Sequence, residues 1–301
     1  MVCTSARAAT DWLFTKSGSW PPFAPGPRFR RKRESRRHVF LIFADDVHRD
    51  ALAFDAPQLP VFVSLIISPT YKSNYAQFKR LGVAQDDILD PDDKFVVEKV
   101  VDIVNAERDD LLEYRQKLAM LKELKANIKN PYDLQENYGL FSEFIGLDGN
   151  WITPEHKWGG RKPKMAVFVD DAQSTAIFRN RQFLNLVTRS RHIGSFEGDE
   201  ASIGISMFIA IQNYTSQGGG LPKTVRGNLT HFACFRNKNI NELNLIASEM
   251  SGEVSPEKFM EAYDYVMSDQ EDKHAFLFVD LHKKDNHPSM FRKNYTEFIV
   301  L

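Results

Sequence analysis

Apolar runs of strand length recur along the chain, separated by segments whose apolar positions repeat at helical spacing. The runs are 38–44, 61–67, 164–169, 203–211, 229–235 and 274–279. A continuous apolar run of this length is typical of a strand buried on both faces, as in parallel sheets. Strand and helix alternate over 164–280, which predicts an α/β fold with a mostly parallel sheet flanked by helices.

Helical signals lie between these runs. The longest covers about 92–130, a charged amphipathic stretch that ends at Asn130-Pro131. We expect further helices at 177–188 and 239–250. Another helix opens at Ser255-Pro256, because serine is a good cap and proline fits the first turn.

Two carboxylates, Asp170 and Asp171, follow the run 164–169 directly. Open α/β sheets bind their ligands at the carboxyl ends of the strands. At that edge one acid can hold Mg²⁺, and its neighbour can orient a water that attacks a phosphate. Gln212 follows the run 203–211, so it would lie beside both acids if the two strands are parallel neighbours.

Charge and cysteine usage narrow the class of protein. The 301 residues carry a formal net charge of −1, so any binding to nucleic acid must come from local basic patches. Cys3 and Cys234 lie far apart and in no metal-ligand spacing, which favours a reducing, intracellular setting. No apolar stretch reaches the ~18 residues that a membrane span needs, and the N-terminus lacks the apolar core of a secretion signal. We therefore expect an intracellular protein with no membrane partner.

Residues 1–37 differ in composition from the rest. The proline-rich segment 20–27 is followed by a run of Lys and Arg that ends at Arg37. This composition favours a disordered tail, or sequence foreign to the domain. The alternative is a nucleic-acid contact or a nuclear-import signal. We expect a single domain over 38–301, with the helical stretch 92–130 as an insertion.

Several motifs occur in an order that resembles one family. They are an apolar strand ending in Asp170-Asp171, the pair Arg191-His192, a strand ending in Gln212, and Leu-Pro-x-x-x-Arg-x-Asn over 221–228. This order is similar to that of the FtsK/HerA superfamily of P-loop ATPases. The nearest likeness is to the poxvirus-like DNA-packaging ATPases of large double-stranded DNA viruses and their virophage and polinton-like relatives. The resemblance covers roughly 60–301.

The resemblance implies a P-loop NTPase-like core of the RecA/FtsK type and a role for each polar residue. Asp170 would be the acid that holds Mg²⁺, Asp171 the acid that activates water, and Gln212 the sensor. Arg226, and secondarily Arg191, would be arginine fingers that reach a neighbouring subunit's γ-phosphate. The implied cofactors are Mg²⁺ and ATP. The implied function is genome packaging during virion assembly, in which a homo-oligomeric ring couples ATP hydrolysis to translocation of double-stranded DNA.

The implied partners are therefore double-stranded DNA and capsid proteins, in the host cytoplasm or nucleus or in the virion. Lys223, beside the glycine loop 218–220, and Arg191 are the candidates for facing the DNA. Contacts of this kind would be made to phosphates, without sequence preference and with strong salt dependence.

Each role has a structural alternative. Asp171 would cap the following helix, and Arg226 or Arg191 would form an ion pair within the subunit. His192 and His231 would be structural histidines. Cys234, inside an apolar strand, would belong to the core.

The phosphate-binding loop of the family is missing from the sequence. Such a loop has the form G-x-x-x-x-G-K-[ST], and no Gly-Lys dipeptide occurs in the chain. One explanation is that the chain is truncated or mis-joined, and thus incomplete at the N-terminal end of the core. We favour this explanation because the likeness ends abruptly near residue 60. Alternatively it is a degenerate relative that binds DNA or partner subunits without hydrolysis. In the third reading the pair Asp45-Asp46 or Asp170-Asp171 serves another metal chemistry, such as that of a Mg²⁺-dependent nuclease. As written, the polypeptide is expected to be a poor ATP hydrolase.

Overall fold

The computed structural model describes residues 40–44, 62–80, 83–127, 139, 142–146, 149–198, 202–215, 220–250, 252, 254–269, 272 and 274–301. The N-terminal segment 1–37, the pair Asp45-Asp46 and most of the glycine loop lie outside these residues.

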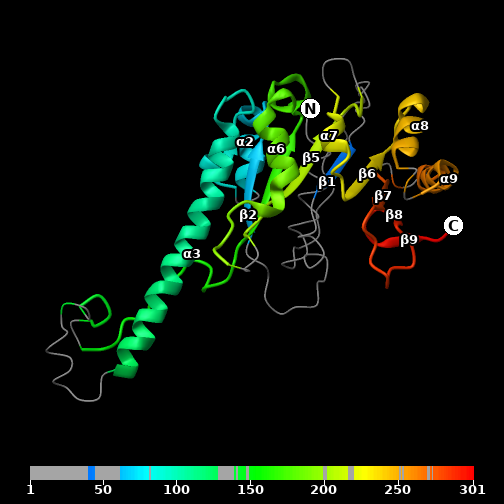
Figure 1. Ribbon diagram of the computed structural model, residues 1–301. Coiled ribbons are helices and arrows are strands. Elements are labelled where there is room, and N and C mark those ends of the chain that lie inside the picture. The colour runs from blue at the N-terminus through cyan, green and yellow to red at the C-terminus, as the bar shows by residue number, and fades with distance from the viewer. Residues whose placement is uncertain are drawn as a thin grey trace, which may run out of the picture.

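Within the described residues, nine strands form one sheet in the order β3-β2-β4-β5-β1-β6-β7-β8-β9 (Figure 1). The strands are β1 (Phe40–Ala44), β2 (Phe62–Ile67), β3 (Ile88–Leu89), β4 (Lys164–Asp170), β5 (Ser206–Ile211), β6 (His231–Phe235), β7 (Phe276–Asp280), β8 (Phe291–Lys293) and β9 (Glu297–Ile299). Strands are thus found within or overlapping all six apolar runs, as the sequence predicted.

The helices are α2 (Tyr71–Arg80), α3 (Val96–Asn127), α6 (Arg181–Arg189), α7 (Lys223–Arg226), α8 (Ile240–Glu249) and α9 (Pro256–Met267). Short 3₁₀ helices cover Gln85–Asp87, Ala172–Ser174, Ile177–Arg179 and Ser190–His192. In the part of the chain that the structure describes, no helix is both long enough and apolar enough to span a lipid bilayer.

The direction of the strands corrects the expectation of a mostly parallel sheet. β3, β2, β4 and β5 are parallel neighbours, whereas every pairing from β5 to β9 is antiparallel. Two helices, α8 and α9, lie between β6 and β7, and each reverses the chain once. The chain therefore enters β7 at the edge where it left β6 and runs antiparallel to it. The fold is mixed α/β with a four-stranded parallel part.

β1 lies in the middle of the sheet, antiparallel to both β5 and β6. Phe40 pairs with Ile211 and Ala44 with Met207, so β1 begins where β5 ends. Because β1 is antiparallel to both neighbours, β5 and β6 point in the same direction.

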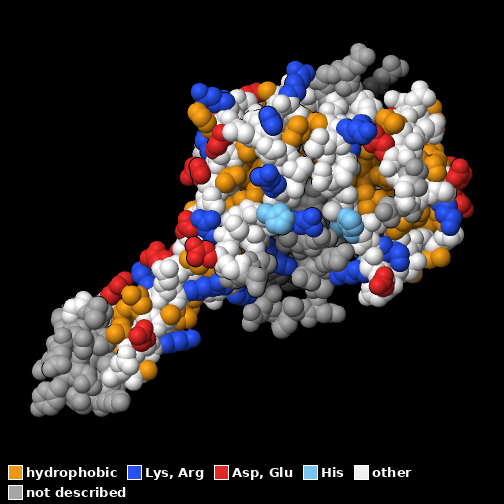
Figure 2. All heavy atoms as spheres, in the orientation of Figure 1, with side chains coloured by type: hydrophobic (Ala, Val, Ile, Leu, Met, Phe, Trp, Pro, Cys, Tyr) orange, Lys and Arg blue, Asp and Glu red, His pale blue; other side chains and the backbone are white. Residues whose placement is uncertain are grey.

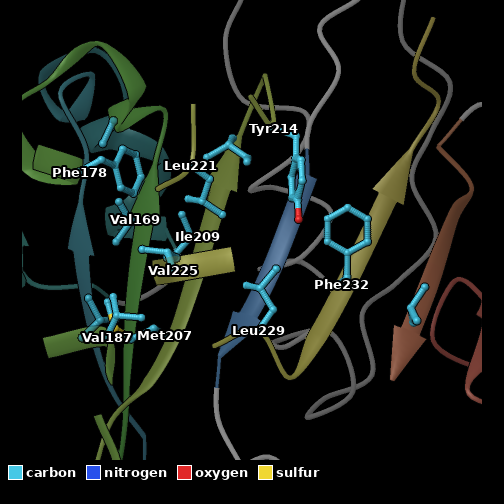
Figure 3. Packing of buried hydrophobic residues seen from close by; sticks show 14 of the residues in the cluster. Val169, Phe178, Val187, Met207, Ile209, Tyr214, Leu221, Val225, Leu229 and Phe232 are labelled. Carbon is cyan, nitrogen blue, oxygen red and sulfur yellow. The ribbon is translucent and has the colours of Figure 1, made fainter. Parts of the chain in front are cut away.

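The main core lies on the face of the sheet that is covered by α3, α6, α8 and α9. Figure 3 shows Val169 of β4 near Phe178, and Phe232 of β6 beside Tyr214, in this cluster. Alternate residues of β4 belong to the opposite face, where a smaller cluster is rich in phenylalanine. The strands are thus buried on both faces, as apolar runs predict.

The helix expected over 177–188 is interrupted. A 3₁₀ helix ends at Arg179, and α6 begins after Asn180, whose side chain accepts a hydrogen bond from the backbone N–H of Gln182 at 2.8 Å. Asparagine is a strong helix cap, so a new helix starts there. By contrast, the predicted cap Ser255 of α9 is confirmed, and Asn239 caps α8 in the same way.

The long helical stretch is confirmed as α3, with bounds inside the predicted 92–130. Its first half is anchored in the core, while its second half extends away from the body of the molecule (Figure 1). The returning chain is held to it by the buried carboxylate of Glu107, which accepts hydrogen bonds from Lys157 Nζ and Trp158 Nε1, both at 2.7 Å. A buried acid that is paired in this way fixes the loop before β4.

Candidate functional site at the carboxyl edge of the parallel strands

The adjacency of β4 and β5 brings the polar residues at their ends together. The strands pair in parallel, with Asp170 opposite Ala210. Gln212 Nε2 donates a hydrogen bond to Asp171 Oδ1 at 2.6 Å. The prediction that Gln212 lies beside the two acids is therefore confirmed.

Asp171 has an unusual backbone conformation. Its φ of +52° and ψ of +27° lie in the left-handed region, which costs a non-glycine residue about 1 kcal/mol. Its side chain makes no hydrogen bond to cap the 3₁₀ helix Ala172–Ser174 that follows. The helix-cap alternative is therefore wrong, because the carboxylate is engaged by Gln212 instead.

Asp170 carries a carboxylate that is largely shielded from water. Burial, and secondarily the neighbouring Asp171, raises the pKa of Asp170 to about 6. Within the described residues, no group donates a hydrogen bond to this carboxylate. An acid next to another acid, without a donor, is the environment that a divalent cation neutralises.

The metal that the resemblance implies is Mg²⁺, and its candidate ligands are the carboxylates of Asp170 and Asp171. Among the described residues, no group of three or more His, Cys, Asp or Glu side chains is arranged to hold a metal ion. A metal that needs an all-protein cage therefore does not fit. Mg²⁺ does fit, because it is usually held by one or two carboxylates and completes its shell with water and substrate phosphates. Asp170 would hold it, with Asp171 beside it.

Gln173 is a residue of the site that the sequence analysis missed. Its Oε1 accepts hydrogen bonds from the backbone N–H groups of Gln212 (2.7 Å) and Asn213 (3.2 Å), and its Nε2 donates to Asn213 O (2.7 Å). The side chain thus clamps the end of β5 to the end of β4. A polar residue two positions after Asp171 was a weak signal, because many loop glutamines bind only water.

A second set of buried polar contacts holds the chain beyond Gln212. Glu242, which is buried, accepts hydrogen bonds from the backbone N–H groups of Tyr214 and Thr215. Tyr214 donates its hydroxyl to Glu249 at 2.7 Å, and burial together with this carboxylate raises the pKa of Tyr214. The tyrosine therefore stays protonated and remains a donor.

Arg226 is bound within its own subunit. Its Nη2 lies 3.2 Å from Glu249 Oε1, and its guanidinium lies over the ring of Tyr214, 5.1 Å from the centroid. Only 14% of the side chain is exposed. The arrangement matches the ion-pair alternative that the sequence left open, and the role of Arg226 as an arginine finger stays a prediction.

Arg191 and His192 lie at the opposite edge of the sheet. The backbone N–H of Ile205, just before β5, donates to Ser190 O at 3.0 Å, so the turn Ser190–His192 lies where β5 begins. β5 has six residues, so roughly 20 Å separate this turn from Gln212. Arg191 thus lies far from the acids of its own subunit, and its role as an arginine finger toward a neighbouring subunit stays a prediction. The cause is α6, which carries the chain back along the strands.

The remaining predictions have mixed outcomes. Lys223 is exposed at the first turn of α7. His231 is a buried structural histidine, as predicted, with Nε2 3.4 Å from Asp280 Oδ1, whereas His192 is exposed. Cys234 is fully buried in the core, as predicted.

β1 does not fit as the strand that precedes a phosphate-binding loop beside Asp170. The phosphate-binding loop of P-loop proteins follows a strand and must lie at the same edge as the metal-binding acid. β1, the strand between β5 and β6, ends with Ala44 opposite Met207, near the start of β5. A loop that follows β1 would therefore leave the sheet at the edge away from Asp170.

Comparison of the chain with protein-family models, with curated proteins and with solved structures finds no match. The function is therefore inferred from the geometry of the site and from the motifs.

Proposed function

We propose that this chain carries the metal-binding and water-orienting half of a nucleotide-dependent motor site, on an α/β core related to the viral DNA-packaging ATPases. The observation that carries the proposal is the Asp171–Gln212 hydrogen bond next to the shielded carboxylate of Asp170. Acid, acid and amide at the ends of two parallel strands are the groups that position Mg²⁺ and a water for attack on a phosphate.

Each residue has a separate task in this proposal. Asp170 supplies the carboxylate for Mg²⁺, which when bound stabilises charge on phosphate oxygens. Gln212 holds Asp171 by Oδ1, so the other oxygen of Asp171 is left to accept a hydrogen bond from water. Gln173 fixes the backbone from which Gln212 projects. The ring assembly, the capsid partners and the viral setting rest on the motif order alone and stay predictions.

The proposal is tested by phosphate release from ATP, with and without duplex DNA, at pH 8, where Asp170 is ionised. Since the chain lacks a phosphate-binding loop, we expect slow hydrolysis that requires Mg²⁺ and falls at least 100-fold in Asp171→Asn. Asp92→Asn, an exposed acid that follows β3, is the matched control and should hydrolyse ATP at the wild-type rate. Hydrolysis that is unchanged in Asp171→Asn would exclude the assigned role.

One observation favours a second function, that of a DNA-binding or assembly subunit without turnover. The reversed β1 cannot bring a phosphate-binding loop to Asp170, because it ends near the start of β5, at the opposite edge of the sheet. This reading predicts that Mg²⁺ raises the melting temperature of the wild type but not of Asp170→Asn, while neither protein hydrolyses ATP. If the protein cleaves DNA in the presence of Mg²⁺ but without nucleotide, a nuclease function would be favoured over both of these.

A further inference from the structure

We propose that double-stranded DNA binds at the amino edge of the parallel strands, on a basic platform formed by Arg115, Lys162, Arg189, Arg191 and His192. The inference extends the proposed function, since it rests on double-stranded DNA being the partner. It places the DNA at the opposite edge from Asp170 and excludes Lys223 as the main contact.

The turn that carries Arg191 and His192 is firmly seated. Three backbone hydrogen bonds tie it to the chain before β5, from Ile203 N–H to Gly194 O, Gly204 N–H to Ile193 O, and Ile205 N–H to Ser190 O, all between 2.9 and 3.0 Å. Both Arg191 and His192 are exposed on it. Preformed, exposed cations lose little conformational freedom when they meet a phosphate.

Two glycines allow this close seating. Gly194 and Gly204 have φ values of +64° and +68°, which glycine adopts without strain. A Cβ at Gly194 would lie 2.8 Å from Val104 Cγ1, so the turn packs directly on α3.

A buried phenylalanine links the turn to two further cations. Lys162 Nζ lies 4.5 Å from the ring centroid of Phe196, and the Arg115 guanidinium carbon lies 5.5 Å from it. Three segments that are distant in the chain, namely α3, the residues before β4 and the turn after α6, therefore place cations at one edge. Arginine retains several N–H donors while it stacks on a ring, so stacking is compatible with phosphate binding.

Two of the three segments are mainly basic, while α3 carries the acids Asp109, Asp110 and Glu113 near Arg115, and Asp199 and Glu200 follow the turn in the sequence. The segments 161–164 and 189–198 contain five Lys or Arg residues and a single acid, Glu197. Figure 2 shows Lys and Arg side chains spread over the visible face, with two histidines near its middle. Duplex DNA carries one negative charge per about 1.7 Å of its axis, so a platform of this kind meets several phosphates at once. The acids at the opposite edge repel the same polyanion, which orients it.

The test is binding of a fluorescent duplex to the whole chain, followed by anisotropy from 50 to 300 mM salt without nucleotide or Mg²⁺. The variant is Arg189→Gln with Arg191→Gln, because both side chains are exposed. Loss of two phosphate contacts lowers the slope of log K against log salt by about 1.8, and we expect about tenfold or more weaker binding at 100 mM salt. The control is Lys238→Gln with Lys258→Gln, two exposed lysines elsewhere, which should change the affinity less than twofold.

Two further variants make the outcome decisive. Arg189→Lys with Arg191→Lys keeps both charges and should bind nearly as the wild type does, which separates charge from folding. An equal loss in the Lys238/Lys258 control, or a larger loss in Lys223→Gln, would overturn the platform. Binding to vesicles of anionic phospholipid with no binding to DNA would overturn it as well. Since the binding assay contains no nucleotide, its result does not depend on whether the protein hydrolyses ATP. Likewise, a failure to bind DNA at this edge would leave the hydrolysis result unaffected.

Discussion

The two edges of the parallel strands are chemical opposites. At the carboxyl edge, Asp170 ends β4 and Asp171 follows it, and Asp90, Asp92 and Asp93 follow β3. At the amino edge, the exposed Arg189, Arg191 and His192 lie on a turn shaped by glycine. The same strands thus separate, by the length of a strand, a place that attracts cations from a place that attracts anions.

The two edges also differ in what they cost the fold. The amino-edge cations are largely exposed, and exposed charges affect stability little. Asp170 is shielded and receives no hydrogen bond from the described residues, so its ionised form destabilises the folded state. We therefore expect the ionised Asp170 to lower the stability of the fold and the amino-edge charges to leave it nearly unchanged. Substitutions at the two edges, and one in the antiparallel part of the sheet, probe this contrast.

The largest effect is expected from Asp170→Asn. The pKa of Asp170 rises from 3.8 to about 6 on folding, so its contribution favours the folded state below pH 3.8 and is lost as pH rises through about 6. Two pKa units correspond to about 3 kcal/mol, so the variant should be more stable than the wild type by up to that amount at pH 8. At pH 3.5 the two proteins should be nearly equal. Urea unfolding at both pH values measures the difference, and a less stable variant at pH 8 would contradict the contrast.

Gly194→Ala addresses the amino edge. The left-handed φ costs alanine about 1 kcal/mol, and the new Cβ would contact Val104 at 2.8 Å, so we expect a loss of about 2 kcal/mol. Gly198→Ala is the matched control, because Gly198 has φ of +82° but no atom within 4 Å of a built Cβ. The difference between the stability losses of the two variants, measured by thermal unfolding, gives the contribution of the contact with Val104. Equal losses would mean that the turn is not pressed against α3.

Gln173→Ala removes the clamp between the ends of β4 and β5. Three backbone groups of Gln212 and Asn213 lose their partner, and we expect about 1–2 kcal/mol of destabilisation and a weaker effect of Mg²⁺ on the melting temperature. Gln182→Ala, which removes an exposed hydrogen bond to Glu98, should change the stability by less than about 0.5 kcal/mol. The idea fails if both variants behave alike.

The smallest effect is expected at His287. Its pKa is lowered by burial and then by Arg292, Lys283 and Lys284, against an opposing effect of Asp280. A lowered histidine pKa gives stability that is present above about 6.5 and is lost as pH falls through the lowered value. His287→Asn should therefore flatten the loss of stability between pH 7 and pH 5, as followed by urea unfolding. A steeper loss in the variant would show that another group titrates there.

The sequence predicted those parts of the fold that depend on local signals. Each apolar run contains or overlaps a strand, and the meeting of Gln212 with Asp171 followed from strand adjacency alone. The helix 177–188 was mispredicted because apolar spacing outweighed the cap at Asn180. The orientation of β1 could not be predicted, since an apolar run pairs equally well in either direction.

The contacts at the site that could not be predicted are hydrogen bonds between residues that lie far apart in the sequence. Gln173, Glu242 and Glu249 act through contacts 27 to 40 residues away, which no spacing rule connects. Arg226 fits the motif order, yet Glu249 binds it within the subunit. The motif fixes residue type, whereas the fold decides what each side chain faces.

The placement of β1 has a consequence for synthesis on the ribosome. Phe40 leaves the ribosome long before its partner Ile211, and Cys234 on the other side comes later still. Until β5 and β6 have been made, the apolar segment Phe-Leu-Ile-Phe-Ala of β1 has no strand to pair with. Once both have been made, the gap between them can take up the β1 of another copy as well as its own, so nascent-chain crowding and chaperone supply would limit the yield of monomer.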